Sequence, residues 1–156
     1  MSATLKQLPE GYKIRPMEPT DYSVLKILEV LTTVGSISEE QFSLQVEEWK
    51  QNDRIYNPLV VTNNNDDVVA CGMLFVEFKL IHELGKVGHI EDIAVRSDQQ
   101  GLQLGKHLIL ALTEIARSKG CYKVILDCDE KNVGFYQKCG YSVAGVEMSI
   151  RFDKYC

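Results

Sequence analysis

The sequence lacks the features that mark disulfide-bonded, metal-binding and membrane-spanning proteins. Its cysteines form no CxxC pair and no Cys/His ligand spacing, and their odd number favours reduced, mostly buried thiols in a reducing compartment. The longest apolar stretch, residues 68–76, is far too short to cross a bilayer, and residues 1–10 have no apolar core of the signal-peptide type. We therefore predict a cytoplasmic protein with no metal site and no membrane span. The five cysteines are Cys71, Cys121, Cys128, Cys139 and Cys156.

An excess of positive charge is also missing. The 17 Lys and Arg residues are outnumbered by 22 Asp and Glu residues, which gives a formal net charge of -5. A general nucleic-acid binder would show a basic stripe, so we expect no nucleic-acid partner, although a local cluster of cations and backbone amides could still bind a small anion. With 45% hydrophobic and 25% charged residues and no linker or repeat, residues 1–156 are predicted to form one globular domain.

The pattern of apolar residues predicts an α/β (α+β) fold. Alternating or continuous apolar runs indicate strands at residues 12–17, 59–62, 68–80, 89–95, 123–126 and 141–152, with a hairpin turn at residues 82–86. Helical spacing and capping signals indicate helices that begin near residues 19 and 38, follow residue 106 and occupy residues 132–138. This order predicts a mixed sheet covered by helices on both faces, in which residues 123–126 form a buried strand.

Three helix boundaries are marked by particular residues. The apolar stripe that starts at Val24 predicts a first helix ending near residues 33–35. Ser38, with Gln41 three residues later, resembles a capping box and predicts the start of the next helix. Gly120 is expected to close the helix that follows residue 106, because glycine readily adopts the left-handed conformation of a helix end.

A glycine-bearing turn, residues 100–106, separates an apolar strand from an amphipathic helix. Such a turn aims several backbone N–H groups at one point, and the helix dipole adds positive charge, so the turn suits a phosphate or pyrophosphate. It is not a P-loop, because Gly101 and Gly105 are one residue too close together and His107 stands where Ser or Thr must be. The Rossmann pattern is absent as well. By itself, the turn could equally be a plain connection between strand and helix.

The segments on either side of this turn carry a resemblance. Residues 88–96 precede it and residues 132–141 follow it. With them the sequence resembles the GNAT acetyltransferases, in which a strand ending in Ala-Val leads to Q/R-x-x-G-x-G/A, and N-x-x-x-F-Y-x-x-x-G-F/Y comes later. Further matches narrow the resemblance to the eukaryotic, especially fungal, members that acetylate glucosamine 6-phosphate, at residues 31–35, 81–85, 121–123, 126–128 and 147–151.

The resemblance implies the GNAT fold, with a mixed, mostly antiparallel sheet of six to seven strands. It implies acetyl-CoA as the co-substrate, no metal, and intertwined homodimers whose active sites are shared between subunits. The implied reaction is direct attack of the glucosamine 6-phosphate amine on acetyl-CoA in a ternary complex, as a step toward UDP-GlcNAc. Two alternatives stay open: a GNAT enzyme with another acceptor, such as a polyamine or a protein N-terminus, and a catalytically silent CoA-binding regulator.

The resemblance also assigns residues to the two ligands. It assigns cofactor contacts to Ile93, Ala94, Val95, Gln100, Gly101, Leu102, Gln103, Leu104, Gly105, Lys106, Asn132 and Tyr136. It assigns substrate contacts to Thr32, Lys79, Leu80, Ile81, His82, Glu91, Asp92, Ile93, Asp127, Cys128 and Arg151. The types of residue suit a sugar phosphate, because the arginine fork matches phosphate oxygens and carboxylates accept hydrogen bonds from hydroxyl and ammonium groups.

Three of these residues carry the chemistry that the resemblance implies. Glu91 is the expected proton acceptor, directly or through water, and the main-chain carbonyl of Asp127 helps to orient the amine. Tyr136 would stabilise the departing thiolate, because a phenol can donate a hydrogen bond or a proton. A strand N–H near Ile93 would polarise the thioester.

Adjacent strand residues face opposite sides of the sheet, so Glu91 and Asp92 can share one task only if a bulge intervenes. No cysteine is expected to act as a nucleophile, since none has a positioned histidine.

Gln103 departs from the family pattern, which has a glycine at that position. A glutamine there costs little if the residue is helical with negative φ, and it is disfavoured where φ must be positive. Because Gly101 and Gly105 remain, we expect CoA binding to survive the change.

The three histidines are candidates for a general base, because an imidazole can accept a proton near neutral pH. His107, on an early helix turn, is expected at the surface, and His89, at the start of a strand, is ambiguous. His82 lies in a segment that the resemblance assigns to the sugar phosphate. Ordinary hydrogen-bonded histidines remain the alternative for all three.

Overall fold

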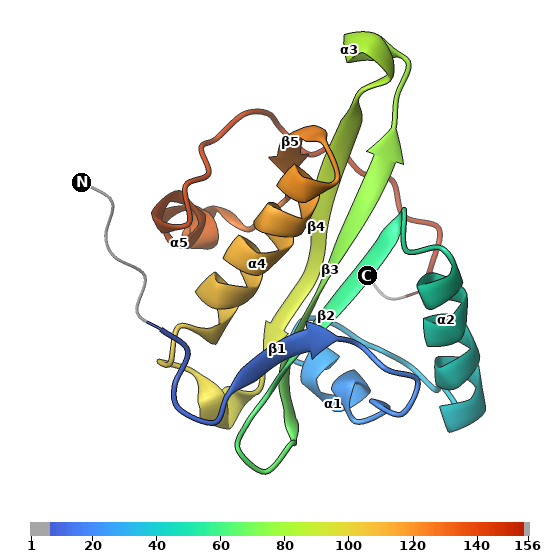
Figure 1. Ribbon diagram of the computed structural model, residues 1–156, viewed down its shortest axis with the longest axis vertical. Helices are drawn as coiled ribbons and strands as arrows, with labels where there is room; N and C mark the ends of the chain where they lie inside the picture. Colours follow the sequence, from blue (N-terminus) through green and yellow to red (C-terminus); the bar gives the residue numbers. More distant parts are fainter. Residues whose placement is uncertain (1–6, 155–156) are drawn as a thin grey trace.

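A five-stranded sheet runs through the middle of the protein, and helices cover both of its faces (Figure 1). The computed structural model describes residues 7–154. The strands are β1 (Lys13–Pro16), β2 (Tyr56–Thr62), β3 (Val68–Phe78), β4 (Lys86–Val95) and β5 (Cys121–Ile125). The helices are α1 (Val24–Leu28), α2 (Glu39–Gln51), α3 (Ile81–Leu84), α4 (Leu104–Ser118) and α5 (Val133–Lys138), with 3₁₀ turns η1 (Ser97–Gln99) and η2 (Glu130–Asn132). The strands stand in sequence order; β1 to β4 are antiparallel neighbours, and β5 is parallel to β4.

Each face of the sheet has its own apolar core. On one face, α4 packs the fully buried side chains of Leu104, Leu108 and Leu112 against the strands. On the other face, α1 and α2 contribute the buried Val24 and Val46. Burial of a side chain of this size stabilises a fold by about 1.5–3 kcal/mol, so these apolar stripes hold both helical layers on the sheet.

Two of the predicted helix boundaries are confirmed and one is wrong. The capping box forms at the start of α2: the Gln41 N–H donates to Ser38 Oγ (3.1 Å), and the Ser38 N–H donates to Gln41 Oε1 (2.8 Å). Gly120 follows α4 with a φ of +81°, as a helix-ending glycine should. In contrast, α1 ends at Leu28 rather than near residues 33–35. The β-branched residues that follow have low helix propensity, which explains the early end.

The middle of β4 contains a β-bulge. Glu91 pairs with Met73 and Ala94 with Cys71, so two residues of β4 lie opposite the single Gly72 of β3. Asp92, inside the bulge, has a φ of +55°. The bulge changes the direction in which the neighbouring side chains point, so the strict alternation of faces expected for Glu91 and Asp92 does not hold here.

The edge of β4 that faces β5 is only partly paired. The parallel ladder with β5 ends at the pair His89 and Ile125. β4 continues to Val95, so in the described chain its residues 90–95 have no strand beside them on the β5 side. Their backbone groups on the β5 side therefore form an open strand edge, which is a template for an added strand.

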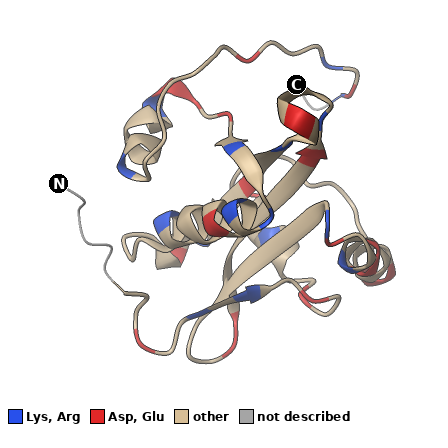
Figure 2. Cartoon of the chain, turned by 45° about the horizontal axis from the view of Figure 1, so that its top comes forward, with Lys and Arg blue, Asp and Glu red and all other residues tan. Residues whose placement is uncertain are grey.

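The last predicted strand is absent from the part of the chain that the structure describes. Residues 141–152 have no regular secondary structure, so the sheet has five strands rather than six to seven. The alternating side chains of Val146, Met148, Ile150 and Phe152 are 77–92% exposed. A strand forms only where a neighbouring strand pairs with it, and this segment arches away from the sheet (Figure 2). For the same reason β5, predicted to be buried, has an exposed outer side.

The predicted turn at residues 82–86 is a left-handed turn. His82, Glu83 and Leu84 all have positive φ, between 51° and 61°, within the short element α3. This element closes the β3–β4 hairpin at one end of the sheet (Figure 1). Residues other than glycine rarely adopt this backbone conformation. Those that do are found preferentially at functional sites.

Candidate functional site

The turn between β4 and α4 forms an open cradle for an anion. η1 ends at Gln99, and α4 starts at Leu104 and is 15 residues long. Gly101 has a φ of +87°, and no atom lies within 4 Å of the place where its Cβ would be. The first N–H groups of α4 have no partner within the helix, and they carry the positive end of its dipole. Binding of a phosphate at this turn stays a prediction, which rests on these exposed backbone N–H groups.

Gly105 links this turn to two other parts of the chain. A Cβ at Gly105 would lie 3.4 Å from Phe135 Cζ on α5 and 3.7 Å from Val95 Cγ2 at the end of β4. The motif segments before and after the turn thus meet in space. A Cβ there would be in van der Waals contact with both neighbours, so the three elements come close together at this point.

Gln103 adopts the less favourable of the two conformations considered for it. It is the N-cap residue of α4 and has φ +60° and ψ +25°, in the left-handed region. Its side chain makes no capping hydrogen bond. A left-handed residue with a Cβ costs roughly 1–2 kcal/mol more than a right-handed one, so the turn stores strain that a glycine would remove.

The variant Gln103→Gly should be more stable than the wild type. Relief of the left-handed strain outweighs the added freedom of the unfolded chain, so we expect a gain of about 0.5–1 kcal/mol in the free energy of unfolding. Chemical denaturation of both proteins measures it. Gln45→Gly, in the exposed middle of α2, is the matched control and should lose about 0.5–1 kcal/mol. Equal losses in both variants would contradict the assignment of strain to Gln103.

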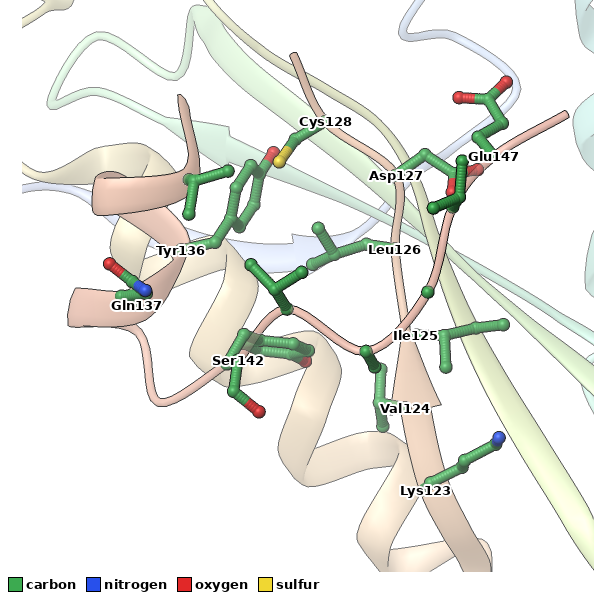
Figure 3. A pocket seen from close by; sticks show the side chains of 16 residues that line it. Lys123, Val124, Ile125, Leu126, Asp127, Cys128, Tyr136, Gln137, Ser142 and Glu147 are labelled. Atoms are coloured by element: carbon green, nitrogen blue, oxygen red, sulfur yellow. The ribbon is translucent and has the colours of Figure 1, made fainter. Parts of the chain in front are cut away.

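A pocket of about 440 Å³ lies between the end of β5, α5 and the segment that follows α5 (Figure 3). Several side chains in its walls can exchange protons or donate hydrogen bonds. These groups belong to Lys123, Asp127, Cys128, Tyr136, Tyr141 and Glu147. Three of the residues assigned by resemblance, Asp127, Cys128 and Tyr136, are therefore brought together in one cavity.

Tyr136 places a partly buried phenol in the wall of this pocket. Burial raises the pKa of its phenol above the ordinary value, with further contributions from Cys128, Cys139 and Tyr141. Its ring points toward Cys128 across the pocket (Figure 3). A phenol with a raised pKa keeps its proton at neutral pH and can donate it to an oxygen or sulfur atom.

Glu91 lies at the bulge, and its environment is acidic. Partial burial is the largest cause that raises the pKa of its carboxyl, and Asp92 and Asp127 raise it further. Asp127 belongs to the pocket, so the bulge of β4 and the pocket at the end of β5 lie close enough to interact. A carboxylate with a raised pKa is a stronger base, which suits a proton acceptor.

Sequence reasoning missed the network next to Glu91. His89 Nε2 lies 3.0 Å from Glu77 Oε1, and Lys79 Nζ lies 3.1 Å from Glu77 Oε2. These two contacts lower the pKa of Glu77, the contact with His89 most of all. The sequence contained part of the signal, because His89 and Glu91 are two apart on a predicted strand and must share a face, but the contact of His89 with Glu77 depends on the register of β3 and β4.

Other assigned residues do not reach the pocket within one chain. Thr32 follows α1, residues 79–82 lie at the tip of the β3–β4 hairpin, and Arg151 pairs with Asp153 in the C-terminal segment (Figure 1). None of them is among the residues that line the pocket. Asn132 ends η2 and stands at the N-terminus of α5 without a side-chain capping bond.

The burial of the histidine and cysteine side chains agrees only in part with the sequence predictions. His107 is only 8% exposed, not at the surface as predicted, because it lies on the side of α4 that packs on the sheet. His82 stacks on Tyr122, with ring centres 4.2 Å apart. Of the described cysteines, Cys71 and Cys139 are buried and Cys128 is exposed; Cys156 lies outside the described residues. Burial raises the pKa of Cys71 to about 12.

Within residues 7–154, no group of three or more His, Cys, Asp or Glu side chains is arranged to hold a metal ion. In the same part of the chain, no helix combines the length and the apolar character that a membrane span requires.

Comparison with known proteins identifies the family. Residues 23–141, which include β2 to β5, α4 and the cradle, match the acetyltransferase (GNAT) family. The chain belongs to this family. The GNAT fold, the family and the enzyme class predicted from the sequence are therefore confirmed, apart from the number of strands. GNAT acetyltransferases use acetyl-CoA, and the cradle, the open edge of β4 and the pocket with Tyr136 provide the kinds of groups that such a molecule needs.

Several relatives of this GNAT protein match about nine tenths of the chain. A glucosamine 6-phosphate N-acetyltransferase of Candida albicans is 56% identical over 147 residues, which cover 93% of this chain and 99% of that protein. The crystal structure of the Arabidopsis thaliana enzyme of the same name has a TM-score of 0.87 at 38% identity, covering 91% of this chain and 99% of that one. A predicted acetyltransferase from Clostridium acetobutylicum, solved with acetyl-CoA, shares the fold at a TM-score of 0.70 and 13% identity, covering 90% and 96%.

Proposed function

We propose that this GNAT protein transfers the acetyl group of acetyl-CoA to the amine of D-glucosamine 6-phosphate. The products are CoA and N-acetyl-D-glucosamine 6-phosphate, a precursor of UDP-GlcNAc. Relatives with this activity in their names, from a fungus and a plant, match nearly the whole chain and support the proposal. The observation that carries it in the structure is the meeting of Val95, Gly105 and Phe135, which joins an anion cradle to the elements that form the pocket.

The cradle and the open edge of β4 fit the two ends of CoA. The pyrophosphate would lie on the backbone amides of residues 100–106. The pantetheine arm carries amide groups, and it would add to the β5-facing edge of residues 93–95 much as an extra strand would. Asn132, at the start of α5, would hold the cofactor from the other side. The thioester then comes to lie at the pocket, near Tyr136.

The amine attacks the thioester carbonyl directly, in a ternary complex. Glu91 takes a proton from the substrate ammonium, directly or through water, and the main-chain carbonyl of Asp127 orients the amine. The N–H near Ile93 stabilises the negative charge that forms on the carbonyl oxygen. The C–S bond then breaks, and Tyr136 donates its proton to the departing thiolate of CoA, while the second proton lost by the attacking nitrogen returns to the Tyr136 phenolate through water.

The sugar phosphate would require residues from two subunits. Glu91, Asp92 and Ile93 at the bulge, with Asp127 and Cys128 at the pocket, would contact the sugar. Thr32, residues 79–82 and Arg151 lie elsewhere in the chain and would contact the sugar phosphate in an assembly of two chains. We therefore propose a homodimer with shared active sites, working in the cytoplasm.

The C-terminal segment supports a homodimer. Val146, Met148, Ile150 and Phe152 alternate with polar residues, which is the pattern of a strand with one buried face, yet all four are exposed. Burying each of these side chains would contribute about 1.5–3 kcal/mol. A second copy of the same chain offers the matching open strand edges, so we propose that the segments of two chains pair with each other's sheets.

Release of free thiol from acetyl-CoA, measured against a panel of amines, tests the proposed function. We expect rapid release with glucosamine 6-phosphate and much slower release with glucosamine, spermidine and a peptide with a free N-terminus. Faster thiol release with spermidine or the peptide than with glucosamine 6-phosphate would show that the proposed acceptor is wrong. Tight acetyl-CoA binding without thiol release for any amine would instead point to a regulatory protein.

Arg151→Ala should weaken binding of the sugar phosphate alone. Loss of a guanidinium–phosphate contact typically costs about 1.5–3 kcal/mol, so we expect the KM for glucosamine 6-phosphate to rise roughly 10- to 100-fold. The affinity for CoA should not change. Steady-state kinetics with each substrate varied in turn measures both. Arg117→Ala, on the exposed side of α4, is the control and should leave both values unchanged. Equal KM values for wild type and Arg151→Ala would remove Arg151 from the phosphate site.

A further inference from the structure

His89 is held in one orientation by side chains of the neighbouring strand. Its Nε2 contacts Glu77, whose other carboxylate oxygen contacts Lys79. Its ring also packs edge-on against Phe75, with the ring centres 5.5 Å apart. These contacts fix the imidazole of His89 beside the carboxylate of Glu77.

His89 and Glu91 lie on the same face of the sheet. Residues two apart on a strand share a face, and the regular register with Phe75 and Met73 continues through both residues before the bulge begins. Their Cα atoms are therefore about 7 Å apart. At this distance a charge on the imidazole acts directly on the carboxylate of Glu91.

Negative groups surround Glu91 on its other sides. Asp92 follows it on β4, Asp127 follows β5, and Glu147 lies in the C-terminal segment; all three raise the pKa of Glu91, whereas His89 lowers it. Met73, opposite on β3, has no charge. In such a cluster, a carboxylate without a nearby cation would keep its proton to higher pH and could not accept another.

We propose that His89, positioned by Glu77, is the counter-charge that keeps Glu91 ionised and able to accept the proton of the substrate amine. This role rests on the proposed acetyl transfer, in which Glu91 is the base. His89 is a positioning residue, since it acts only through Glu91. The carboxylate of Glu91 accepts protons only at a pH above its own midpoint. Without His89 this midpoint rises, so the lower pH limit of the reaction rises with it.

The variant His89→Gln tests the role, because glutamine can still donate a hydrogen bond to Glu77 but has no charge. The side-chain carboxyl carbon of Glu91 is followed by NMR during a pH titration of the full chain. We expect the midpoint of Glu91 to rise by about half a pH unit in the variant, as for one charge lost at this distance. The acidic limb of the pH profile of kcat/KM should move up by the same amount. Lys50→Gln, which removes a positive charge from the distant exposed pair with Glu18, should move neither.

The two measurements separate this role from the proposed function. A rise in the Glu91 midpoint together with a matching shift of the acidic limb supports the role. An unchanged Glu91 midpoint in His89→Gln overturns it, whatever the activity. A raised midpoint in a protein whose wild type transfers no acetyl group would mean that the acetyl-transfer proposal fails, while the electrostatic coupling of His89 to Glu91 stands.

Discussion

Tyr136→Phe is expected to lower kcat by roughly 10²- to 10⁴-fold, the range that a positioned acid typically contributes. The variant keeps the ring that packs against Phe135 but loses the proton that the CoA thiolate needs. Because the interaction is made only as the C–S bond breaks, the KM for both substrates should change little. Steady-state kinetics of acetyl transfer measures the effect. The raised pKa of Tyr136 further predicts that the wild type keeps this phenol protonated to a higher pH than an ordinary tyrosine.

Tyr141→Phe is the matched control for this experiment. Tyr141 lines the same pocket, but its hydroxyl is already bonded to Thr113 Oγ1 at 2.6 Å. We expect an unchanged kcat and a loss of about 1 kcal/mol in the free energy of unfolding. A kcat for Tyr136→Phe as high as that of Tyr141→Phe would remove Tyr136 from the mechanism.

Ile150→Asp is expected to abolish both dimerisation and acetyl transfer. Its side chain is 77% exposed in one chain but would be buried between two. An aspartate there would have to bury an unpaired charge, which costs several kcal/mol. Sedimentation should find the wild type at twice the mass of one chain and the variant at the mass of one. If the sugar-phosphate site needs residues of two chains, as we propose, thiol release by the variant should fall at least roughly 100-fold.

Leu44→Asp provides the comparison for this variant. Leu44 is 59% exposed on α2, so the same kind of change occurs outside the C-terminal segment through which we propose that the chains pair. This variant should remain dimeric and active. A wild type that sediments as a single chain, or an Ile150→Asp variant that stays dimeric, would contradict the proposed pairing of C-terminal segments.

Patterns that act locally predicted much of this fold. The capping box of Ser38 and Gln41 needs only a few neighbouring residues, and it formed as expected. The same holds for the order of strands and helices up to α5, since each element carries its own periodicity. The meeting of Gly105 with Phe135 was not predicted, although the family resemblance placed both residues in motif segments that it linked to CoA.

Features that depend on distant parts of the chain were not predictable in the same way. The alternation of apolar and polar residues within residues 141–152 indicates that one face of this segment is to be buried. It does not indicate which strand or chain will cover that face. The positive φ of Gln103 is set by the path between η1 and α4, and no periodicity records it. The burial of His107 depends on how α4 rotates against the sheet. The Glu77–His89 contact requires the register of β3 and β4, which the sequence alone does not define.

Discrimination between glucosamine 6-phosphate and glucosamine tests the central claim most directly. The wild-type kcat/KM for acetyl transfer is measured for each amine at the same acetyl-CoA concentration. If the acceptor is a sugar phosphate held by an arginine, kcat/KM should be at least roughly 100-fold higher for the phosphorylated sugar, corresponding to about 3 kcal/mol of phosphate binding. Equal values for the two sugars would contradict the account.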